Sequence, residues 1–377
     1  MIQQLMSVML FVPGFISGYT TILTQNCMEE RCPMDVNRMI MKLNNDATPM
    51  KDKLFVPSQT EEVYTKAKWS LDTIDKNCFS ITEGTPLPPT LERGGHMGAC
   101  INGVPVLTGG NNWNLDRTQK NWLQSTLFFI QNKWVEGPSI PIPLGHAMYG
   151  SDDKGFYIAG GTSDGLHSSD KVFKLTSTSK DAVWETLSHL PTPLSYGSGA
   201  VLNGRFYLTG GMHDSLRSRK MWVLNLKDEN AQWVECPEFK GPSRILSALV
   251  PHGKYLYLLG GLGDSKPLDV LEDAYRYDTE RKSWEQLPDL PLKGYAWSGS
   301  AVDEHHILLT GRAYGKIDTG IWLLDVTTMK WERIGSTIMP ATTAPLIRVH
   351  QKQWWLVGGE PDANKNRTGR ISVISKY

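Results

Sequence analysis

The sequence has few cysteines, no net charge and no long apolar run. Its five cysteines include no C-x-x-C pair, which argues against a zinc site built from cysteine pairs. Basic and acidic residues balance at 39 each, so the chain offers no electrostatic footprint for nucleic acid or an anionic membrane surface. No segment is long and apolar enough to span a bilayer as a helix. These absences predict neither a nucleic-acid partner nor a membrane partner.

Several catalytic motifs are also missing. The sequence has no G-x-S-x-G nucleophile elbow, no H-x-x-x-H metal motif and no phosphate-binding P-loop. A galactose-oxidase-like chemistry would need copper ligands and a cross-linked tyrosine, and no local pattern assembles them. The sequence therefore disfavours a carbohydrate oxidase and predicts a site without metal or cofactor.

The first 70 residues do not follow the pattern of the rest of the chain. Residues 5–16 are mostly apolar and have the length of a signal h-region, but no Lys or Arg precedes them and no A-x-A cleavage site follows. This favours a periplasmic or secreted protein, with a cytoplasmic location as the alternative. Cys27 and Cys32 are close enough in sequence for a local disulfide, and free thiols are the other interpretation.

Two residue patterns recur about every 50 residues. Tryptophans follow one another at steps of 50, 49, 51 and 47 residues: Trp134, Trp184, Trp233, Trp284 and Trp331. Small-residue pairs recur in phase with them: Gly109-Gly110, Gly160-Gly161, Gly210-Gly211, Gly260-Gly261, Thr310-Gly311 and Gly358-Gly359. A period near 50 is typical of kelch repeats. Because these residues recur once per unit, they indicate architecture and not a binding site.

Each unit contains four short apolar runs bounded by turn residues. In residues 194–235 these are LSYGSGAVL, FYLTGG, KMWVLNL and QWVEC, which predict four antiparallel strands. Four such strands form one propeller blade. The fold class is therefore all-β, with a six-bladed kelch-type β-propeller over residues 77–377. In this fold the tryptophans should pack between blades, and the glycine pairs should allow close backbone approach.

The last unit lacks its fourth strand. The chain ends at Tyr377, while residues 76–82 (KNCFSIT) have the character of a fourth strand, with Phe79 near the position of the missing Trp. We expect this N-terminal strand to complete the C-terminal blade, because closing the ring removes two exposed sheet edges.

Candidate site residues are those that break the repeat. Glu360 directly follows the last glycine pair, where the other units carry Asn111, Thr162, Met212, Leu262 and Arg312. A partly desolvated glutamate on the inner rim can accept and return a proton, and Arg367 in the same loop can bind a carboxylate. The alternative is a surface loop with one acid and one base.

Four further residues are candidates for binding a substrate. Arg244 and His146 fall near the start of a first strand, which lines the channel of a propeller. Asn111 and Trp113 follow the first glycine pair and could meet a sugar through hydrogen bonds and ring stacking; Trp113 stands outside the periodic tryptophans. For His146 a purely structural role is the more common one for a lone histidine.

The segments GGEPDANKNRT and GPSRILSALV, on the kelch pattern, resemble the N-acetylneuraminate epimerase (sialic acid mutarotase) family. The similarity covers about residues 77–377, and the blade order resembles that of a circularly permuted member. It implies that Glu360 is the proton acceptor, that Arg367 is catalytic, and that Arg244 matches a strand start of the family. The loop that carries Arg367 is one residue longer in this chain.

The resemblance implies an isomerase that interconverts the α and β anomers of N-acetylneuraminate, a small sugar acid, by general acid–base catalysis. The alternative is a non-catalytic kelch propeller that binds a protein or a glycan through its loops, because propellers support many functions. The absence of an adaptor domain before the repeat weakens that alternative. The sequence does not indicate an oligomeric state.

Overall fold

The computed structural model describes residues 78–264 and 269–377. The chain divides into two units, residues 1–67 and 68–377, and only the second contains described residues. The predictions for residues 1–70, including the apolar segment and the Cys27–Cys32 pair, lie outside the described part. Within it, no helix is long and apolar enough to cross a membrane.

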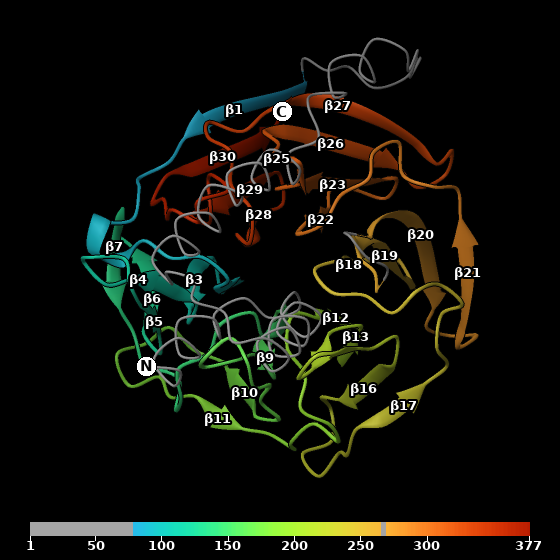
Figure 1. Ribbon diagram of the computed structural model, residues 1–377, viewed down its shortest axis with the longest axis horizontal. Coiled ribbons are helices and arrows are strands. Elements are labelled where there is room, and N and C mark those ends of the chain that lie inside the picture. The colour runs from blue at the N-terminus through green and yellow to red at the C-terminus, as the bar shows by residue number, and fades with distance from the viewer. Residues whose placement is uncertain (1–77, 265–268) are drawn as a thin grey trace, which may run out of the picture. The chain divides into compact units, whose positions relative to one another are not determined.

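Six four-stranded antiparallel sheets stand around a central channel, as Figure 1 shows. From the inner to the outer strand, blade 1 is β2 (Met97–Ile101), β3 (Val104–Thr108), β6 (Thr126–Ile130) and β7 (Lys133–Glu136); blade 2 is β8 (Met148–Asp152), β9 (Gly155–Ala159), β10 (Val172–Leu175) and β11 (Glu185–Thr186); blade 3 is β12 (Ser198–Leu202), β13 (Arg205–Thr209), β16 (Met221–Asn225) and β17 (Val234–Cys236).

The other three blades follow the same order. Blade 4 is β18 (Ala248–His252), β19 (Tyr255–Leu262), β20 (Val270–Asp278) and β21 (Ser283–Leu287); blade 5 is β22 (Ser298–Ala301), β23 (His306–Thr310), β26 (Gly320–Asp325) and β27 (Lys330–Ser336); blade 6 is β28 (Leu346–His350), β29 (Gln353–Val357), β30 (Ile371–Lys376) and β1 (Phe79–Glu83). The predicted six-bladed propeller with four antiparallel strands per blade is confirmed.

Short elements extend three of the blades beyond the second strand. Hairpins are formed by β4 (Asn111–Trp113) with β5 (Lys120–Trp122), by β14 (Met212–His213) with β15 (Leu216–Arg217), and by β24 (Ala313–Tyr314) with β25 (Lys316–Ile317). A 3-10 turn, η2 (Pro89–Leu91), lies between β1 and β2. The β4–β5 hairpin matters most for function, because it carries part of the candidate site.

The N-terminal strand closes the ring in the predicted way. Strand β1 lies on the outer edge of blade 6 beside β30, with pairs running from Phe79↔Lys376 to Glu83↔Ser372 (Figure 1). Phe79 is buried against Trp354 and Ile374. It therefore fills the position that tryptophan occupies in the other blades.

The periodic tryptophans join neighbouring blades. The indole Nε1–H groups of Trp134, Trp184, Trp233 and Trp284 donate to carbonyls near the end of the preceding blade, at Thr85, Pro138, Ser188 and Pro237, over 2.7 to 3.3 Å. A buried indole needs a partner for its N–H, and this arrangement supplies it while the ring fills the gap between sheets. The architectural interpretation of these residues is confirmed.

The glycine pairs sit where one blade meets the next near the axis. A Cβ on Gly109 would lie 2.2 Å from the carbonyl oxygen of Leu144, and a Cβ on Gly160 would lie 2.1 Å from that of Leu194. Both glycines also have positive φ, 63° and 67°. No other residue fits such positions without displacing the neighbouring blade.

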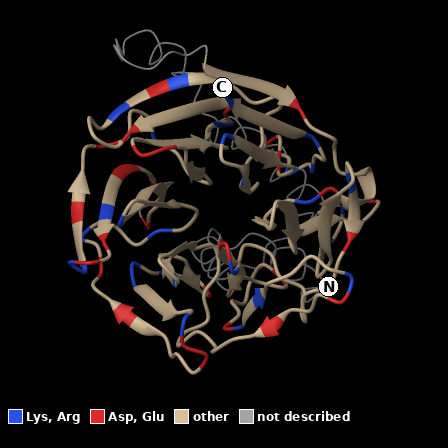
Figure 2. Cartoon of the chain, turned by 180° about the vertical axis from the view of Figure 1, so that it is seen from behind, with Lys and Arg blue, Asp and Glu red and all other residues tan. Residues whose placement is uncertain are grey.

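Charged residues of both signs alternate around the outer strands (Figure 2). The innermost strands are mostly apolar or small, as in β12 (Ser198–Leu202). The charged residues on these six strands are Asp152 on β8 and Arg348 on β28.

Candidate functional site

A ring of six backbone positions forms the mouth of the channel. One residue per blade, just before the first strand, has a φ between 52° and 64°: Gly95, His146, Tyr196, Leu246, Ala296 and Thr343. In five of the six steps around the ring, the N–H of one residue donates to the carbonyl of the residue in the preceding blade, over 2.7 to 2.9 Å. Residues other than glycine rarely adopt this backbone conformation. Here it directs the N–H and carbonyl groups of the six residues towards one another around the mouth of the channel.

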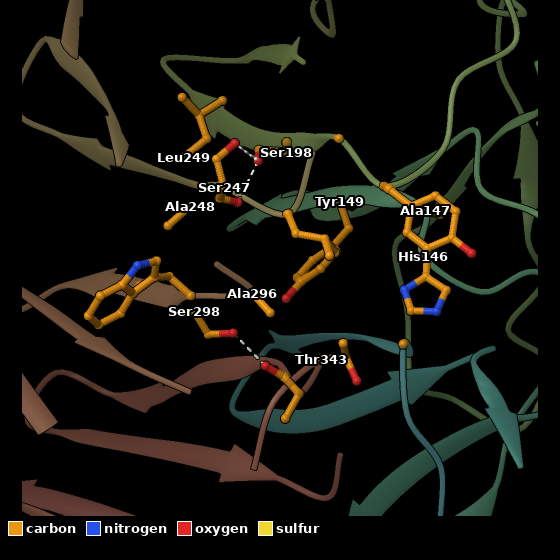
Figure 3. A pocket seen from close by; sticks show the side chains of 18 of the residues that line it. His146, Ala147, Tyr149, Ser198, Ser247, Ala248, Leu249, Ala296, Ser298 and Thr343 are labelled. Atoms are coloured by element: carbon orange, nitrogen blue, oxygen red, sulfur yellow. Dashed lines mark hydrogen bonds between the residues drawn. The ribbon is translucent and has the colours of Figure 1, made fainter. Parts of the chain in front are cut away.

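These residues border a cavity of about 160 Å³ that continues down the channel. Figure 3 shows side chains from several blades around the same opening, His146, Ser198, Ser298 and Thr343 among them. Deeper in the channel the lining combines serines with apolar side chains such as Leu249, and Ser198 bonds Ser247 over 2.9 Å. The cavity therefore offers polar and apolar contacts to a small molecule.

A second layer of residues surrounds this ring. The residue before each ring position pairs with the residue after the glycine pair: Gly94 with Asn111, Gly145 with Thr162, Ser195 with Met212, Ile245 with Leu262, Tyr295 with Ala313, and Thr342 with Glu360. In blade 5 the sequence placed Arg312 at the position that matches Glu360, but the structure places Ala313 there, one residue later. Arg312 is buried and bonds Asp318. Glu360 is the one carboxylate among the six positions.

Glu360 pairs with Thr342, next to the ring residue Thr343, and forms an ion pair with Arg367; neither of these two charged side chains lines the 160 Å³ cavity itself. Its Oε1 lies 3.2 Å from Nη1 of Arg367, and the exposed fractions of the two side chains are 12% and 4%. Together with burial, the charge of Glu360 raises the pKa of Tyr196 to about 12 and also raises the pKa of Tyr295. Burial is the larger cause of both shifts, and the added effect shows that the charge of Glu360 reaches residues of blades 3 and 5.

Asn111 and Gly94 hold this pair in place from blade 1. Arg367 donates from Nε to the backbone oxygen of Asn111 over 3.0 Å and from Nη2 to its Oδ1. A Cβ on Gly94 would lie 3.0 Å from Cγ of Glu360 and 3.1 Å from Nε of Arg367. The sequence predicted Asn111 as a sugar ligand, whereas the structure places its carbonyl groups against the arginine.

Trp113 stands at the centre of a group of cations. The groups closest to its ring are Lys120 at 5.5 Å, Arg117 at 5.7 Å and Arg367 at 5.9 Å from the centroid. Its Nε1–H donates to the backbone oxygen of Lys365 over 2.8 Å. We call Arg117, Lys120, Lys365 and Arg367 the Trp113 cation cluster. The indole therefore organises positive charge beside Glu360, a role that sequence reasoning did not give it.

His146 lies on the ring itself. Its imidazole stacks on Tyr196 with centroids 4.4 Å apart, and a Cβ on Gly95 would clash with it at 2.5 Å. Burial, together with nearby cations led by Lys120, lowers the pKa of His146 to about 3. A neutral imidazole at the mouth can exchange hydrogen bonds with a ligand without adding charge.

Arg244 is not brought to the rest of the predicted set. It is fully buried between blades, with Nη1 and Nη2 donating to the two carboxylate oxygens of Asp273 over 2.8 and 2.7 Å. Its guanidinium lies 4.7 Å from the ring centroid of Phe239 and 5.4 Å from that of Tyr275. This arrangement gives Arg244 a structural part, and its side chain does not line the cavity.

The side of the mouth formed by blades 3 to 5 is apolar. Buried and half-buried residues pack into one cluster there: Tyr196, Met212, Ile245, Leu246, Leu262, Val270, Tyr295 and Tyr314. Blades 6 and 1 carry the Trp113 cation cluster and Glu360. The mouth therefore presents one charged side and one apolar side.

Among residues 78–264 and 269–377, no three His, Cys, Asp or Glu side chains gather as a metal site.

We expect the protein to lose stability in mild acid through its neutral histidines. Burial, with the charge of Arg93 adding to it, holds the pKa of His96 well below 6.5, and His146 behaves likewise. The unfolded imidazoles bind protons below pH 6.5 whereas the folded ones do not, so stability is complete above that pH and falls as pH decreases towards 3. Urea unfolding at pH 7 and pH 5 measures the effect.

In the variant His146→Asn the loss of unfolding free energy between pH 7 and pH 5 should shrink by about 1 to 2 kcal/mol. Asn tolerates the positive φ at this position. An unchanged pH dependence in the variant would show that His146 is protonated in the folded state.

Comparison with known proteins agrees with the fold. The family model described as the KLHDC2/KLHL20/DRC7 Kelch-repeats domain matches residues 95–299. The chain is 29% identical over 164 residues to the N-acetylneuraminate epimerase of Vibrio cholerae, which covers 41% of this chain and 42% of that protein. It is 24% identical over 218 residues to N-acetylneuraminate epimerase 1 of Escherichia coli, which covers 46% and 56%.

A third relative, the N-acetylneuraminate epimerase of Haemophilus influenzae, is 29% identical over 140 residues, which are 37% of this chain and 36% of that protein. The chain thus spans about half or less of the length of the curated relatives it matches. The similarity is partial, so it bears on the kind of protein and leaves the roles of single residues to the geometry.

Proposed function

The chain belongs to the Kelch-repeat domain family, and we propose that it interconverts the α and β anomers of N-acetylneuraminate at the mouth of its channel. The observation that carries the proposal is Glu360, the one carboxylate among six equivalent positions, 12% exposed and 3.2 Å from Arg367. The partial similarity to proteins named N-acetylneuraminate epimerase supports the same substrate.

The reaction requires one proton to move between two oxygens of the sugar. Glu360 accepts the proton of the anomeric hydroxyl, the anomeric carbon becomes a ketone as its bond to the ring oxygen breaks, and Glu360 returns the proton to that ring oxygen. Rotation of the ketone and closure from the other face, with the reverse proton transfers, give the other anomer. A positioned carboxylate typically contributes ~10²–10⁴-fold to such a step.

Arg367 supports this chemistry by fixing the carboxylate. Held by Asn111 and by the backbone of its own loop, it orients the Glu360 side chain between proton transfers. The charged and apolar sides of the mouth suit a sugar that carries a carboxylate at one end and less polar groups at the other.

The direct test is to follow freshly released α-N-acetylneuraminate by proton NMR with and without the protein. Faster approach to the anomeric equilibrium supports the proposal. Equilibration at the spontaneous rate at every protein concentration contradicts it. Binding of the sugar without acceleration would instead indicate a glycan-binding module.

Gly94→Ala should slow anomer exchange about 10-fold or more while the fold is retained. The added methyl would meet Cγ of Glu360 at 3.0 Å and Nε of Arg367 at 3.1 Å, so the catalytic pair must shift, and small misplacements of reacting groups carry large costs in rate. Gly335→Ala is the control, because its methyl meets the side chain of Ile81 at the outer strand β27, away from the mouth. Equal rates in both variants would contradict the placement of the pair.

A further inference from the structure

Arg367 has little capacity left for a substrate. Five protein acceptors surround its guanidinium: the backbone oxygen and Oδ1 of Asn111, the backbone oxygens of Lys365 and Asn366, and Oε1 of Glu360. A guanidinium has five N–H groups, one on Nε and two on each Nη. Three of the acceptors lie at Nη1, one at Nε and one at Nη2, so one Nη2–H has no acceptor among the described residues. A carboxylate could take one hydrogen bond from Arg367 but no bidentate pair without displacing a partner, so its main ligand should be another cation.

Lys120 is such a cation and is already in place. It opens strand β5 opposite Trp113 on β4, and its Nζ lies 5.5 Å from the centroid of the Trp113 ring. Within residues 78–264 and 269–377, no hydrogen bond or ion pair of its ammonium group is found, although an ammonium has three donors. Cation–π contact holds the side chain in position and leaves those donors available.

The other members of the Trp113 cation cluster are less suited. Arg117 donates to the side chain of Asn366 and to the backbone oxygen of Asn364. Lys365 has an exposed side chain, and its backbone oxygen is used by Trp113 and Arg367. Lys120 combines partial burial with an ammonium group that no described residue binds.

Lys120 is also close enough to Glu360 for their charges to interact. Burial lowers the pKa of Lys120 to about 8, the charges of Lys365 and Arg367 add to this, and Glu360 opposes it. In a sugar acid of the proposed class, the carboxylate is attached to the anomeric carbon itself. A residue that binds this carboxylate must therefore lie near the residue that acts on the anomeric hydroxyl. Lys120 meets this condition through Trp113, because its ammonium group and the guanidinium of Arg367, the partner of Glu360, contact the same indole ring.

We propose that Lys120 is the substrate-carboxylate ligand of this site, and that Arg367 positions Glu360 and does not grip the substrate. This inference rests on the proposed function for the identity of the sugar. It assigns the sugar's negative charge to the β4–β5 hairpin of blade 1 and the proton transfer to blade 6. The substrate would bridge the junction where the ring is closed.

The test compares two ligands that cannot exchange anomers: the methyl α-ketoside of N-acetylneuraminate and the methyl ester of the same ketoside. Their dissociation constants are measured by NMR titration with the wild type, Lys120→Met, Lys120→Arg and the control Lys133→Met. Lys133 lies exposed on β7 of the same blade, so its replacement removes the same charge away from the mouth.

We expect Lys120→Met to weaken the ketoside about 10- to 100-fold, the loss typical of one charge-assisted hydrogen bond, and to leave the ester within about 2-fold of the wild type. Lys120→Arg should recover most of the loss, and Lys133→Met should change neither constant. The inference is overturned if Lys120→Met binds the ketoside as tightly as the wild type does. It is also overturned if the substitution weakens the ketoside and the ester equally, or if the wild type binds neither ligand.

Failure of the proposed function is separately visible. If the wild type binds the ketoside through Lys120 but does not accelerate anomer exchange, the assignment of Lys120 stands and the proposed catalysis is wrong. If the wild type accelerates exchange and Lys120→Met has an unchanged KM, the catalysis stands and the assignment of Lys120 is wrong. If both assignments hold, Lys120→Met raises KM and leaves kcat nearly unchanged.

Discussion

Glu360→Gln should slow protein-catalysed anomer exchange by about 10² to 10⁴-fold, the usual contribution of a positioned general base. Glutamine has nearly the same shape and can still accept a hydrogen bond from Arg367, but its amide cannot take up and return a proton. The loss should therefore fall on kcat, while KM stays within several-fold of the wild type because the carboxylate ligand is untouched. Rates from NMR at several sugar concentrations separate the two constants.

Glu92→Gln is the matched control for this substitution. Glu92 lies in the segment before blade 1, near the same junction with blade 6, and its Oε1 accepts from the backbone N–H of Gly369 over 3.0 Å. Glutamine preserves that bond, so this variant should exchange the anomers at the wild-type rate. If Glu360→Gln were as active as Glu92→Gln, the proton would be carried by another group.

Removal of strand β1 should open the ring and cost more stability than any point change at the mouth. A chain that begins at residue 85 lacks the five residues of β1 that pair with β30, and it loses Phe79 from the cluster around Trp354. The newly exposed edge of β30 would also favour aggregation. We expect a chain that begins at residue 70 to fold, and the shorter chain to unfold at much lower urea concentration or to precipitate.

Phe79→Ala in the full chain isolates the contribution of the side chain. The phenylalanine is 9% exposed, and truncating such a residue typically costs about 3 to 5 kcal/mol. Truncation to alanine of the exposed Val234, on the outer strand of blade 3, should cost far less. Similar urea midpoints for the two chains that begin at residues 70 and 85 would show that β1 does not close the propeller.

The blades could be predicted from the sequence because their architecture repeats. Tryptophan and paired glycine recur with a common period, and each has one physical cause. The indole N–H of the tryptophan bonds to the preceding blade, and the backbone at the glycine lies too close to the next blade for a Cβ. The closing strand followed from a missing fourth strand at one end of the chain and a spare one at the other. Local rules thus sufficed for the ring.

The site could be predicted only in part, because it depends on contacts between distant segments. Glu360 stood out as a break in the repeat, and Arg367 was close to it in sequence. Lys120 was missed, because it lies in a hairpin outside the repeat and becomes meaningful only when blade 1 meets blade 6. Arg244 was misleading for the same reason, since its partner Asp273 is supplied from a distance in sequence by the third strand of blade 4.

The alignment of blade 5 shows a further limit. Thr310-Gly311 resembles the glycine pairs in sequence, yet Gly311 takes the first position of the pair and Arg312 the second, so the residue that matches Glu360 is Ala313. Arg312 is stabilised there by Asp318, six residues further along the chain. A one-residue shift of this kind leaves no trace in the period of the repeat.

The location of the chemistry is tested most directly by a crystal structure of the wild type with the methyl α-ketoside of N-acetylneuraminate. We expect the sugar at the mouth of the channel, with its anomeric oxygen directed towards the Glu360 carboxylate and its own carboxylate at Nζ of Lys120. A sugar bound away from the mouth, or one at the mouth with its anomeric oxygen turned away from Glu360, would contradict the proposed chemistry.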